Sequence, residues 1–260
     1  MIKAIFFDID GTLLSFKTRS VPQSAVDALA ELKRRGICVF IATGRSAAQI
    51  DNVSGLGFDG YITFNGCLCL DAGYEPIHEN AIPREDLEAV ARYQEEKEPF
   101  PCAFMSQDEV RINYIDQTVI DLAQLVNLPV PGIKPLREAA KNKVMQVNIY
   151  VDKDRERELM RKVFTRCSAS RWNPLFADIN VRGASKQTGI DRILEHYGIT
   201  LNETMAFGDG GNDIPMLRHV ALGVAMGNAS DEVKRVADYV TDSVDEHGIR
   251  NALQHFKLIG

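Results

Sequence analysis

Apolar residues in the first third of the chain follow two alternating patterns. The run from Ile2 to Phe7 is typical of a buried strand, and the segment from Pro22 to Arg35 places its apolar side chains on one helical face. Ile37 to Ala42 is continuously hydrophobic, as expected for a strand covered on both faces. Three further elements are expected here: a helix at Ser46 to Val53, a strand at Tyr61 to Phe64 and a hairpin at Cys67 to Ile77. This alternation predicts a doubly wound parallel sheet.

The pattern changes at about Pro83, where shorter strands and helices replace the regular alternation. The expected helices are Glu85 to Lys97, Thr118 to Asn127 and Arg155 to Arg166, and the expected strands are Ala103 to Ser106, Val110 to Tyr114, Val144 to Val151 and Ala177 to Val181. After Gly183 the first pattern returns, with a helix around Ile190 and a strand at Thr204 to Phe207. We therefore predict an α/β fold. A doubly wound, Rossmann-like core would comprise residues 1–82 and 183–260, and an inserted α+β domain residues 83–182.

Composition and charge narrow the classes of function. The 260 residues are 45% hydrophobic and carry a net charge of -6, which gives no electrostatic case for binding nucleic acid or an anionic membrane surface. No apolar run approaches the ~18 residues of a membrane span. Five cysteines without a C-x-x-C pair favour buried thiols in a reducing compartment. We therefore expect a cytoplasmic protein, a monomer or a small homo-oligomer, whose partner is a small molecule.

Two carboxylates follow the first predicted strand. Asp8 and Asp10 would project to the same side if the strand continued, and Gly11 lets the backbone turn away after them. At ~4 Å two carboxylates repel by ~4 kcal/mol even at an effective dielectric of about 20. The pair therefore needs a cation or a shared proton, and such crowding usually marks a site of chemistry.

Other polar residues stand at comparable points of the predicted fold. Thr43 follows the second strand, Lys186 opens a helix, and Asp209 and Asp213 follow the strand that ends at Phe207. The carboxyl edge of an open parallel sheet binds ligands, so these remote segments can converge there. Carboxylates suit Mg²⁺, and a lysine pairs with phosphoryl oxygens. The sequence thus predicts a site for a divalent cation and a phosphate, at which an aspartate can accept a phosphoryl group.

The same residues resemble a known family. The segments that carry the resemblance are Asp8-x-Asp10-Gly-Thr-Leu-Leu, Ala42-Thr43-Gly44-Arg45, Ser185-Lys186 and Gly208-Asp209-Gly210-Gly211-Asn212-Asp213. In order and spacing they are similar to the four motifs of the haloacid dehalogenase-like (HAD) hydrolases, and together they are a far stronger signal than any one alone. The inserted module, with Asn65-Gly66 before it, resembles the Cof-type subfamily IIB, whose inserted domain is a C2B cap.

The resemblance implies roles for the acidic residues. Asp8 would be the nucleophile, and Asp10 the general acid that protonates the leaving alcohol and then activates water. Mg²⁺ would be held by the Asp8 side chain, the Asp10 backbone carbonyl and Asp209, with Asp213 in support. Asp10 must start protonated, and we expect crowding with Asp8 in a closed site to favour that proton.

Four positions are implied as phosphate contacts by the same resemblance: Thr43, Gly44, Lys186 and Asn212. One departure is that family members often have a glycine directly after the lysine, where this chain has Gln187. The charge of the lysine is unaffected. The other side chains that could contact substrate are Arg45, Arg171, Trp172, Asp178 and Asn180. Of these, the tryptophan is expected in a core and the arginine at position 171 in solvent.

Each motif also has an ordinary structural interpretation. An Asp-x-Asp after a strand can be a turn with an N-cap, Thr43-Gly44 can be a strand-to-helix turn, and Lys186 can be a solvated lysine. An EF-hand is excluded, because a loop starting at Asp8 has Leu13 and Arg19 where glycine and glutamate are required. The four motifs together favour the functional interpretation.

The leading hypothesis is a Mg²⁺-dependent phosphatase for small phosphorylated metabolites, which works through an aspartyl-phosphate intermediate under an inserted lid. The subfamily likeness implies sugar (hexose) phosphates as substrates. One alternative is a phosphotransferase or mutase on the same scaffold. Another is a phospho-accepting signalling receiver, although its acceptor would normally lie on a middle strand and a receiver lacks such a long insertion.

Overall fold

The computed structural model describes residues 1–126 and 128–260, apart from the side chains of Asn52 and Trp172. The expected core position of Trp172 and the expected helix end at Asn127 therefore lie outside the described residues. The chain divides into two compact units: a core unit of residues 1–45, 50–78 and 185–260, and an inserted unit of residues 46–49 and 79–184. The domain boundaries expected after residues 82 and 182 stay a prediction.

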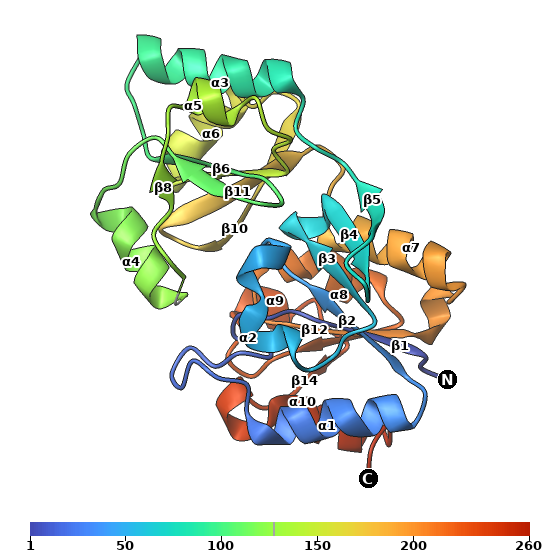
Figure 1. Ribbon diagram of the computed structural model, residues 1–260. Coiled ribbons are helices and arrows are strands. Elements are labelled where there is room, and N and C mark those ends of the chain that lie inside the picture. Colours follow the sequence, from blue (N-terminus) through green and yellow to red (C-terminus); the bar gives the residue numbers. More distant parts are fainter. Residues whose placement is uncertain (127) are drawn as a thin grey trace. The chain divides into compact units, whose positions relative to one another are not determined.

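The core unit is built on an eight-stranded sheet (Figure 1). Its strands, in spatial order, are β14 (Tyr239–Val240), β13 (Leu222–Ala225), β12 (Thr204–Gly208), β1 (Ala4–Phe7), β2 (Cys38–Ala42), β3 (Gly60–Thr63), β4 (Leu68–Asp71) and β5 (Pro76–Glu79). Neighbouring strands from β14 to β3 are parallel, and β4 pairs antiparallel with β3. The doubly wound parallel core expected from the sequence is confirmed.

Helices cover both faces of this sheet. They are α1 (Gln23–Arg34), α2 (Asp51–Ser54), α7 (Lys186–Tyr197), α8 (Ile214–His219), α9 (Asp231–Lys234) and α10 (Gly248–His255). Side chains alternate across β1, so Phe6 packs in one cluster with Ile190 of α7 and Met216 of α8. Phe7 points to the opposite face, where it stacks on Phe207 at 5.1 Å between ring centroids. There α1 and α10 lie side by side (Figure 1).

The order of the strands changes direction at β1. Strands β2 and β3 follow on one side of it, whereas β12, β13 and β14 extend on the other. Phe7 is level with Ile41 of β2 and with Phe207 of β12, so the segments that leave these three strands start at the same edge. In doubly wound sheets this reversal opens a crevice beyond the carboxyl ends, which is where ligands bind.

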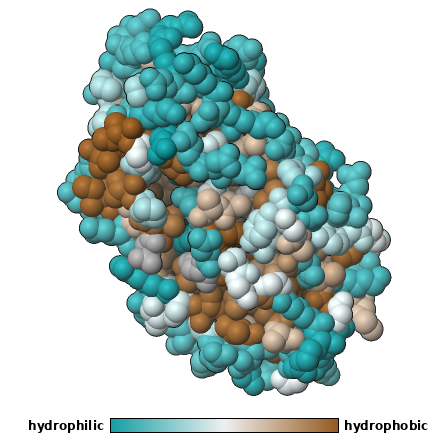
Figure 2. Space-filling model, in the orientation of Figure 1, coloured by the Kyte–Doolittle hydropathy of each residue, from teal (hydrophilic) through white to brown (hydrophobic). Residues whose placement is uncertain are grey.

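The inserted unit has its own six-stranded sheet. Its strands, in spatial order, are β10 (Cys167–Asn173), β11 (Phe176–Val181), β9 (Gln146–Ile149), β6 (Cys102–Met105), β7 (Val110–Ile112) and β8 (Gly132–Ile133). One face packs against α3 (Arg84–Glu96), α5 (Leu136–Ala139) and α6 (Lys153–Lys162), and α4 (Gln117–Leu125) packs on the other. The expected α+β character is confirmed. Figure 2 shows an apolar patch beside α4 and β8, where Leu125, Val130 and Ile133 are exposed.

Some expected elements are different in the structure. The helix expected at Ser46 to Val53 is a 3-10 turn, Ala47–Gln49, followed by the single turn of α2. The segment ends at Gly55 and is too short for a stable helix of its own. Strand β8 and helix α5 were not expected, because they are too short to show a period. All five cysteines are free thiols. Among the described residues, no helix is long and apolar enough to cross a membrane.

Candidate active site

Asp8 stands directly beyond β1, at the carboxyl edge of the core sheet. Its backbone N–H donates to the carbonyl oxygen of Phe207 at 3.0 Å, which extends the pairing with β12 by one residue. The Asp8 carboxylate is buried, and its Oδ1 accepts a hydrogen bond from Lys186 Nζ at 2.5 Å. Lys186 is the first residue of α7 and has no exposed surface. Ser185 caps that helix, because its hydroxyl accepts from the N–H of Thr188.

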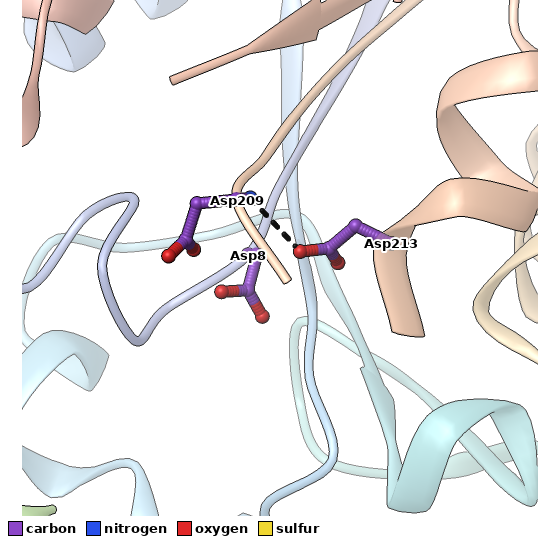
Figure 3. Close-up of side chains that lie close together, drawn as sticks. All are labelled: Asp8, Asp209 and Asp213. Atoms are coloured by element: carbon purple, nitrogen blue, oxygen red, sulfur yellow. Dashed lines mark hydrogen bonds between the residues drawn. The ribbon is translucent and has the colours of Figure 1, made fainter. Parts of the chain in front are cut away.

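Two further carboxylates come from the segment after β12. Asp213 is fully buried, and its Oδ2 accepts from the backbone N–H groups of Asp209 at 3.0 Å and Gly210 at 2.9 Å. Its Oδ1 accepts from Lys186 Nζ at 2.6 Å. Figure 3 shows the carboxylates of Asp8, Asp209 and Asp213 gathered in one place, with the hydrogen bond from the Asp209 backbone. Lys186 therefore joins the first strand to the late acidic loop.

The Asp209 carboxylate lies against the turn that follows Asp10. Gly11 has φ +83°, and a Cβ at this position would stand 2.2 Å from Asp209 Oδ2, so only glycine fits. Asp209 Oδ1 accepts from the Thr12 hydroxyl at 3.0 Å, and Oδ2 accepts from Asn228 Nδ2 at 3.3 Å. Thr12 of the turn and Asn228 of another segment therefore hold this carboxylate from two sides.

The crowded carboxylates shift each other's protonation. Burial raises the pKa of Asp8 to about 7; Lys186 opposes this shift, and the charges of Asp213 and Asp10 add to it. Burial and the charges of Asp8 and Asp213 raise the pKa of Asp209 well above its usual range. Burial lowers the pKa of Lys186, but the charges of Asp213 and Asp8 outweigh it and raise that pKa above its usual value. Negative charge is in excess here, because one ammonium faces three carboxylates.

The donor set fits a divalent cation. Asp8, Asp209 and Asp213 each offer a carboxylate oxygen, and these atoms lie within 4.8 Å of one another. Oxygen donors at this spacing are the ligands that Mg²⁺ prefers, and such a cation would offset the excess negative charge that raises the pKa values. The three aspartates that were expected to converge at this edge therefore lie close together in the structure.

Asp10 lies in a different environment from the one expected. Arg45 donates to its carboxylate from Nε at 2.8 Å and from a terminal nitrogen at 2.6 Å, which is a bidentate ion pair. Both side chains are largely buried, with exposures of 7% and 14%. β1 ends at Phe7 and the chain turns at Gly11, and Asp10 is paired with this arginine, which was not expected. The expected closeness to Asp8 remains, because the charge of Asp10 contributes to the raised pKa of Asp8. The role of Asp10 in catalysis stays a prediction.

The expected phosphate contacts also lie at strand exits. Thr43 follows β2 and is buried; its N–H donates to the carbonyl of Ile62 at 2.8 Å, and its hydroxyl accepts from the N–H of Arg45 at 3.1 Å. Gly44 lies between them in the same turn. Asn212 belongs to the acidic loop, and its Nδ2 donates to Asn65 Oδ1 at 3.0 Å. Whether these residues contact phosphate stays a prediction.

Sequence reasoning missed two side chains that support the site. Thr12 follows the first two aspartates in the sequence, so its place within the Asp8-x-Asp10-Gly-Thr motif could have identified it. Asn228 follows β13, the next parallel strand, so its position at a strand exit could have identified it. Its Nδ2 also donates to the carbonyl of Gly11 at 2.9 Å, and its Oδ1 accepts from the N–H of Val244 at 3.0 Å. Asn228 thus ties the Gly11 turn to the acidic loop.

The other possible substrate contacts belong to the inserted unit. Arg171 was expected in solvent, which is wrong: it is 17% exposed and binds Glu156 at 2.7 Å and the carbonyl of Val151 at 2.8 Å. Asp178 and Asn180 are buried and bind Gln146. No contact of these residues with a substrate is assigned by the structure.

Comparison with known proteins agrees with this geometry. A family model described as haloacid dehalogenase-like hydrolase matches residues 5–253. The chain therefore belongs to the haloacid dehalogenase-like hydrolases, and it is an enzyme of the hydrolase class. Among curated relatives, the Bacillus subtilis (strain 168) protein named "Putative phosphatase YkrA" is 32% identical over 99% of this chain and 98% of that protein.

Solved structures show how far the likeness extends within the family. The HAD subclass IIB sugar phosphatase BT4131 has 43% sequence identity and a TM-score of 0.92, covering 99% of this chain and 100% of that one. BT1666 from Bacteroides thetaiotaomicron, a phosphatase of the same superfamily, has 42% identity and a TM-score of 0.92, covering 100% and 96%. The subclass IIB resemblance, which was drawn from the inserted module and Asn65-Gly66, is confirmed.

Proposed function

We propose that this protein is a Mg²⁺-dependent phosphatase that hydrolyses small phosphorylated metabolites, with sugar phosphates as the expected class. The observation that carries the proposal is the buried Asp8 carboxylate, placed beside Lys186 and within 4.8 Å of two other carboxylates. The similarity to BT4131, described as a sugar phosphatase, supports the substrate class.

Asp8, the backbone carbonyl of Asp10 and Asp209 would hold the cation, and Asp213 would support them. When bound, Mg²⁺ supplies positive charge that neutralises the phosphoryl oxygens and orients them. Lys186 contributes a second, permanent positive charge between Asp8 and Asp213. Together these charges let an anionic nucleophile approach an anionic substrate.

The reaction proceeds in two displacements. Asp8 attacks phosphorus, the bond between phosphorus and the leaving oxygen breaks, and Asp10 gives its proton to the departing alcohol. Asp10 then takes a proton from water, which attacks the aspartyl phosphate and releases inorganic phosphate and free Asp8. Thr43, Gly44 and Asn212 would hold the phosphoryl oxygens during both steps. Arg45 binds the deprotonated Asp10 carboxylate in the structure, so this ion pair would have to open before Asp10 carries the proton that it gives to the alcohol.

A panel of phosphorylated metabolites tests this proposal. We expect phosphate release from sugar phosphates in the presence of Mg²⁺, and loss of that release when the cation is chelated. Equal release with and without chelator would contradict the cation's role, and no release from any ester would contradict the phosphatase itself.

A phosphotransferase or mutase on the same scaffold is the second candidate, because both reactions share the aspartyl phosphate. Product analysis with a free sugar present separates them, since transfer yields a new phosphate ester and hydrolysis yields inorganic phosphate. We further propose that residues 83–182 form the cap domain that selects the substrate. The protein would work in the cytoplasm as a monomer or small homo-oligomer.

A further inference from the structure

The turn that leaves β3 has an unusual backbone. Phe64, Asn65 and Gly66 are consecutive and all left-handed, with φ of 50°, 52° and 95°. Asparagine and glycine adopt this conformation readily, but a bulky residue such as phenylalanine does so rarely. Surrounding contacts must therefore hold the turn in place, and such strained segments cluster at functional sites.

Backbone hydrogen bonds attach this turn to the segment after β2. The N–H of Phe64 donates to the carbonyl of Arg45 at 3.1 Å, and the N–H of Asn65 donates to the carbonyl of Thr43 at 3.0 Å. These bonds use the groups on either side of Gly44. The left-handed turn and the expected phosphate-binding turn are thus fixed to each other through their backbones.

A close approach attaches the same turn to the start of α7. A Cβ on Gly66 would stand 2.1 Å from the carbonyl oxygen of Ser185, so no other residue fits against this backbone. Ser185 is the N-cap residue, and Lys186 follows it. The packing of Gly66 therefore sets the position from which the Lys186 side chain starts.

The side chain of Asn65 makes the third attachment. Asn65 is 4% exposed, and its Oδ1 accepts from Asn212 Nδ2 at 3.0 Å. An ordinary loop between β3 and β4 would need neither this bond nor the contact with Ser185. The turn instead contacts three separate segments that carry expected phosphate-binding residues.

We propose that Asn65 is a positioning residue, which orients the Asn212 amide toward the phosphate of the substrate. This inference rests on the proposed function and adds to it a residue outside the four motifs. Asn65 acts through Asn212, so its effect must vanish when Asn212 is absent.

A double-mutant cycle tests the coupling. Asn65→Gly keeps a residue that tolerates the left-handed backbone and removes the acceptor. The variants Asn65→Gly, Asn212→Ala and the double variant are compared by kcat and KM for an aryl phosphate and by Ki for inorganic phosphate. We expect each single variant to raise Ki and KM about tenfold, the size of one lost hydrogen bond to a charged group. The double variant should be within about twofold of Asn212→Ala, because coupled residues are not additive. The proposal would be overturned if the increases in Ki and KM of the two single variants multiplied in the double variant, or if Asn65→Gly left Ki unchanged.

Controls separate this role from general effects. Lys257 is exposed and also left-handed, with φ 58°, so Lys257→Gly introduces the same change away from the site and should leave Ki and KM unchanged. If Asn65→Gly does not fold, Asn65→Asp retains an acceptor and the left-handed backbone but adds a negative charge. Its Ki for phosphate should then rise at least about tenfold, and an unchanged Ki would refute the role. A wild-type protein inactive on every ester refutes the proposed function instead.

Discussion

The two units of this protein bury polar side chains in opposite ways. At the edge of the core sheet, Asp8, Asp209 and Asp213 crowd around the single ammonium of Lys186. Burial, together with the neighbouring negative charges, raises the pKa of Asp8 and of Asp209. In the inserted unit, the buried carboxylate of Asp178 accepts a hydrogen bond from the amide of Gln146, which also bonds to two other amides.

Gln146 is the centre of this second group. It donates to Asp178 at 3.1 Å and to Asn148 at 3.0 Å, and it accepts from Asn180 at 3.1 Å. Neutral amides satisfy one another without a further ligand, whereas carboxylates near one another need a cation. Buried polarity alone is therefore a weak sign of function, and an excess of buried charge of one sign is a much stronger one.

The largest expected effect is on catalysis. Asp8→Asn keeps the size of the side chain and removes the nucleophile, so phosphate release should fall by more than ~10³-fold. The fold should persist, because one of three repelling carboxylates has been neutralised. Rates of release and circular dichroism measure the two outcomes. Asp27→Asn, at an exposed carboxylate of α1, is the matched control and should keep full activity. Turnover by Asp8→Asn within tenfold of wild type would refute the nucleophile.

Removing the ammonium should affect both stability and activity. Lys186→Met leaves Asp8 and Asp213 without their partner, and breaking a buried pair costs ~3–5 kcal/mol. The loss should be smaller with Mg²⁺ present, because a bound cation compensates the same carboxylates. Chemical unfolding with and without Mg²⁺ gives this difference. Lys162→Met removes an exposed pair with Glu158, for which the expected loss is ~0–1 kcal/mol. An equal loss in both variants would contradict the burial argument.

A substitution in the polar cluster of the inserted unit should lower the free energy of unfolding by the same amount with and without Mg²⁺. Gln146→Leu leaves Asp178 and Asn180 short of a partner, so the free energy of unfolding should fall by ~1–3 kcal/mol. The same unfolding experiment serves here, run at both cation concentrations. If the loss of unfolding free energy in Gln146→Leu depended on Mg²⁺, the polar cluster around Gln146 would not differ from the aspartate cluster around Lys186 in the way that we infer.

The smallest effect concerns pH. Asp8 has a folded-state pKa of about 7, above its ordinary value of 3.8. Between these two pH values the metal-free folded protein keeps a proton on Asp8, whereas the unfolded chain has lost it. The contribution of this proton to the free energy of unfolding is therefore complete below about pH 4 and is lost as the pH rises through about 7. Mg²⁺ binds the carboxylate form of Asp8. The rise in the thermal unfolding midpoint that added Mg²⁺ causes should therefore become larger between about pH 5 and pH 8. Asp8→Asn should reduce that growth. A constant increment in the wild type would count against the raised pKa.

Much of the core could be predicted from its sequence, because each strand exit carries a distinctive polar residue. The convergence of Asp8 and Asp209 follows from the rule that the carboxyl ends of parallel strands share one edge, and Lys186 reaches them from the start of α7. The environment of Asp10 could not be predicted in this way, since the alternation of side chains fails once β1 ends. Its partner Arg45 lies 35 positions away, and no local pattern pairs the two.

The inserted unit was harder to predict in detail. Strand β8 and helix α5 are shorter than the periods that identify such elements. Arg171 was expected in solvent because arginines usually are, but its guanidinium binds Glu156 and two backbone carbonyls. Tertiary contacts of this kind override the average behaviour of a residue type.

The complete burial of Lys186 has a practical consequence. Reagents that acylate primary amines need a neutral, accessible nitrogen, and this one is both shielded and held as an ammonium between two aspartates. Surface lysines such as Lys257 would react first. Dyes or solid supports attached through amines should therefore leave the phosphate site chemically untouched.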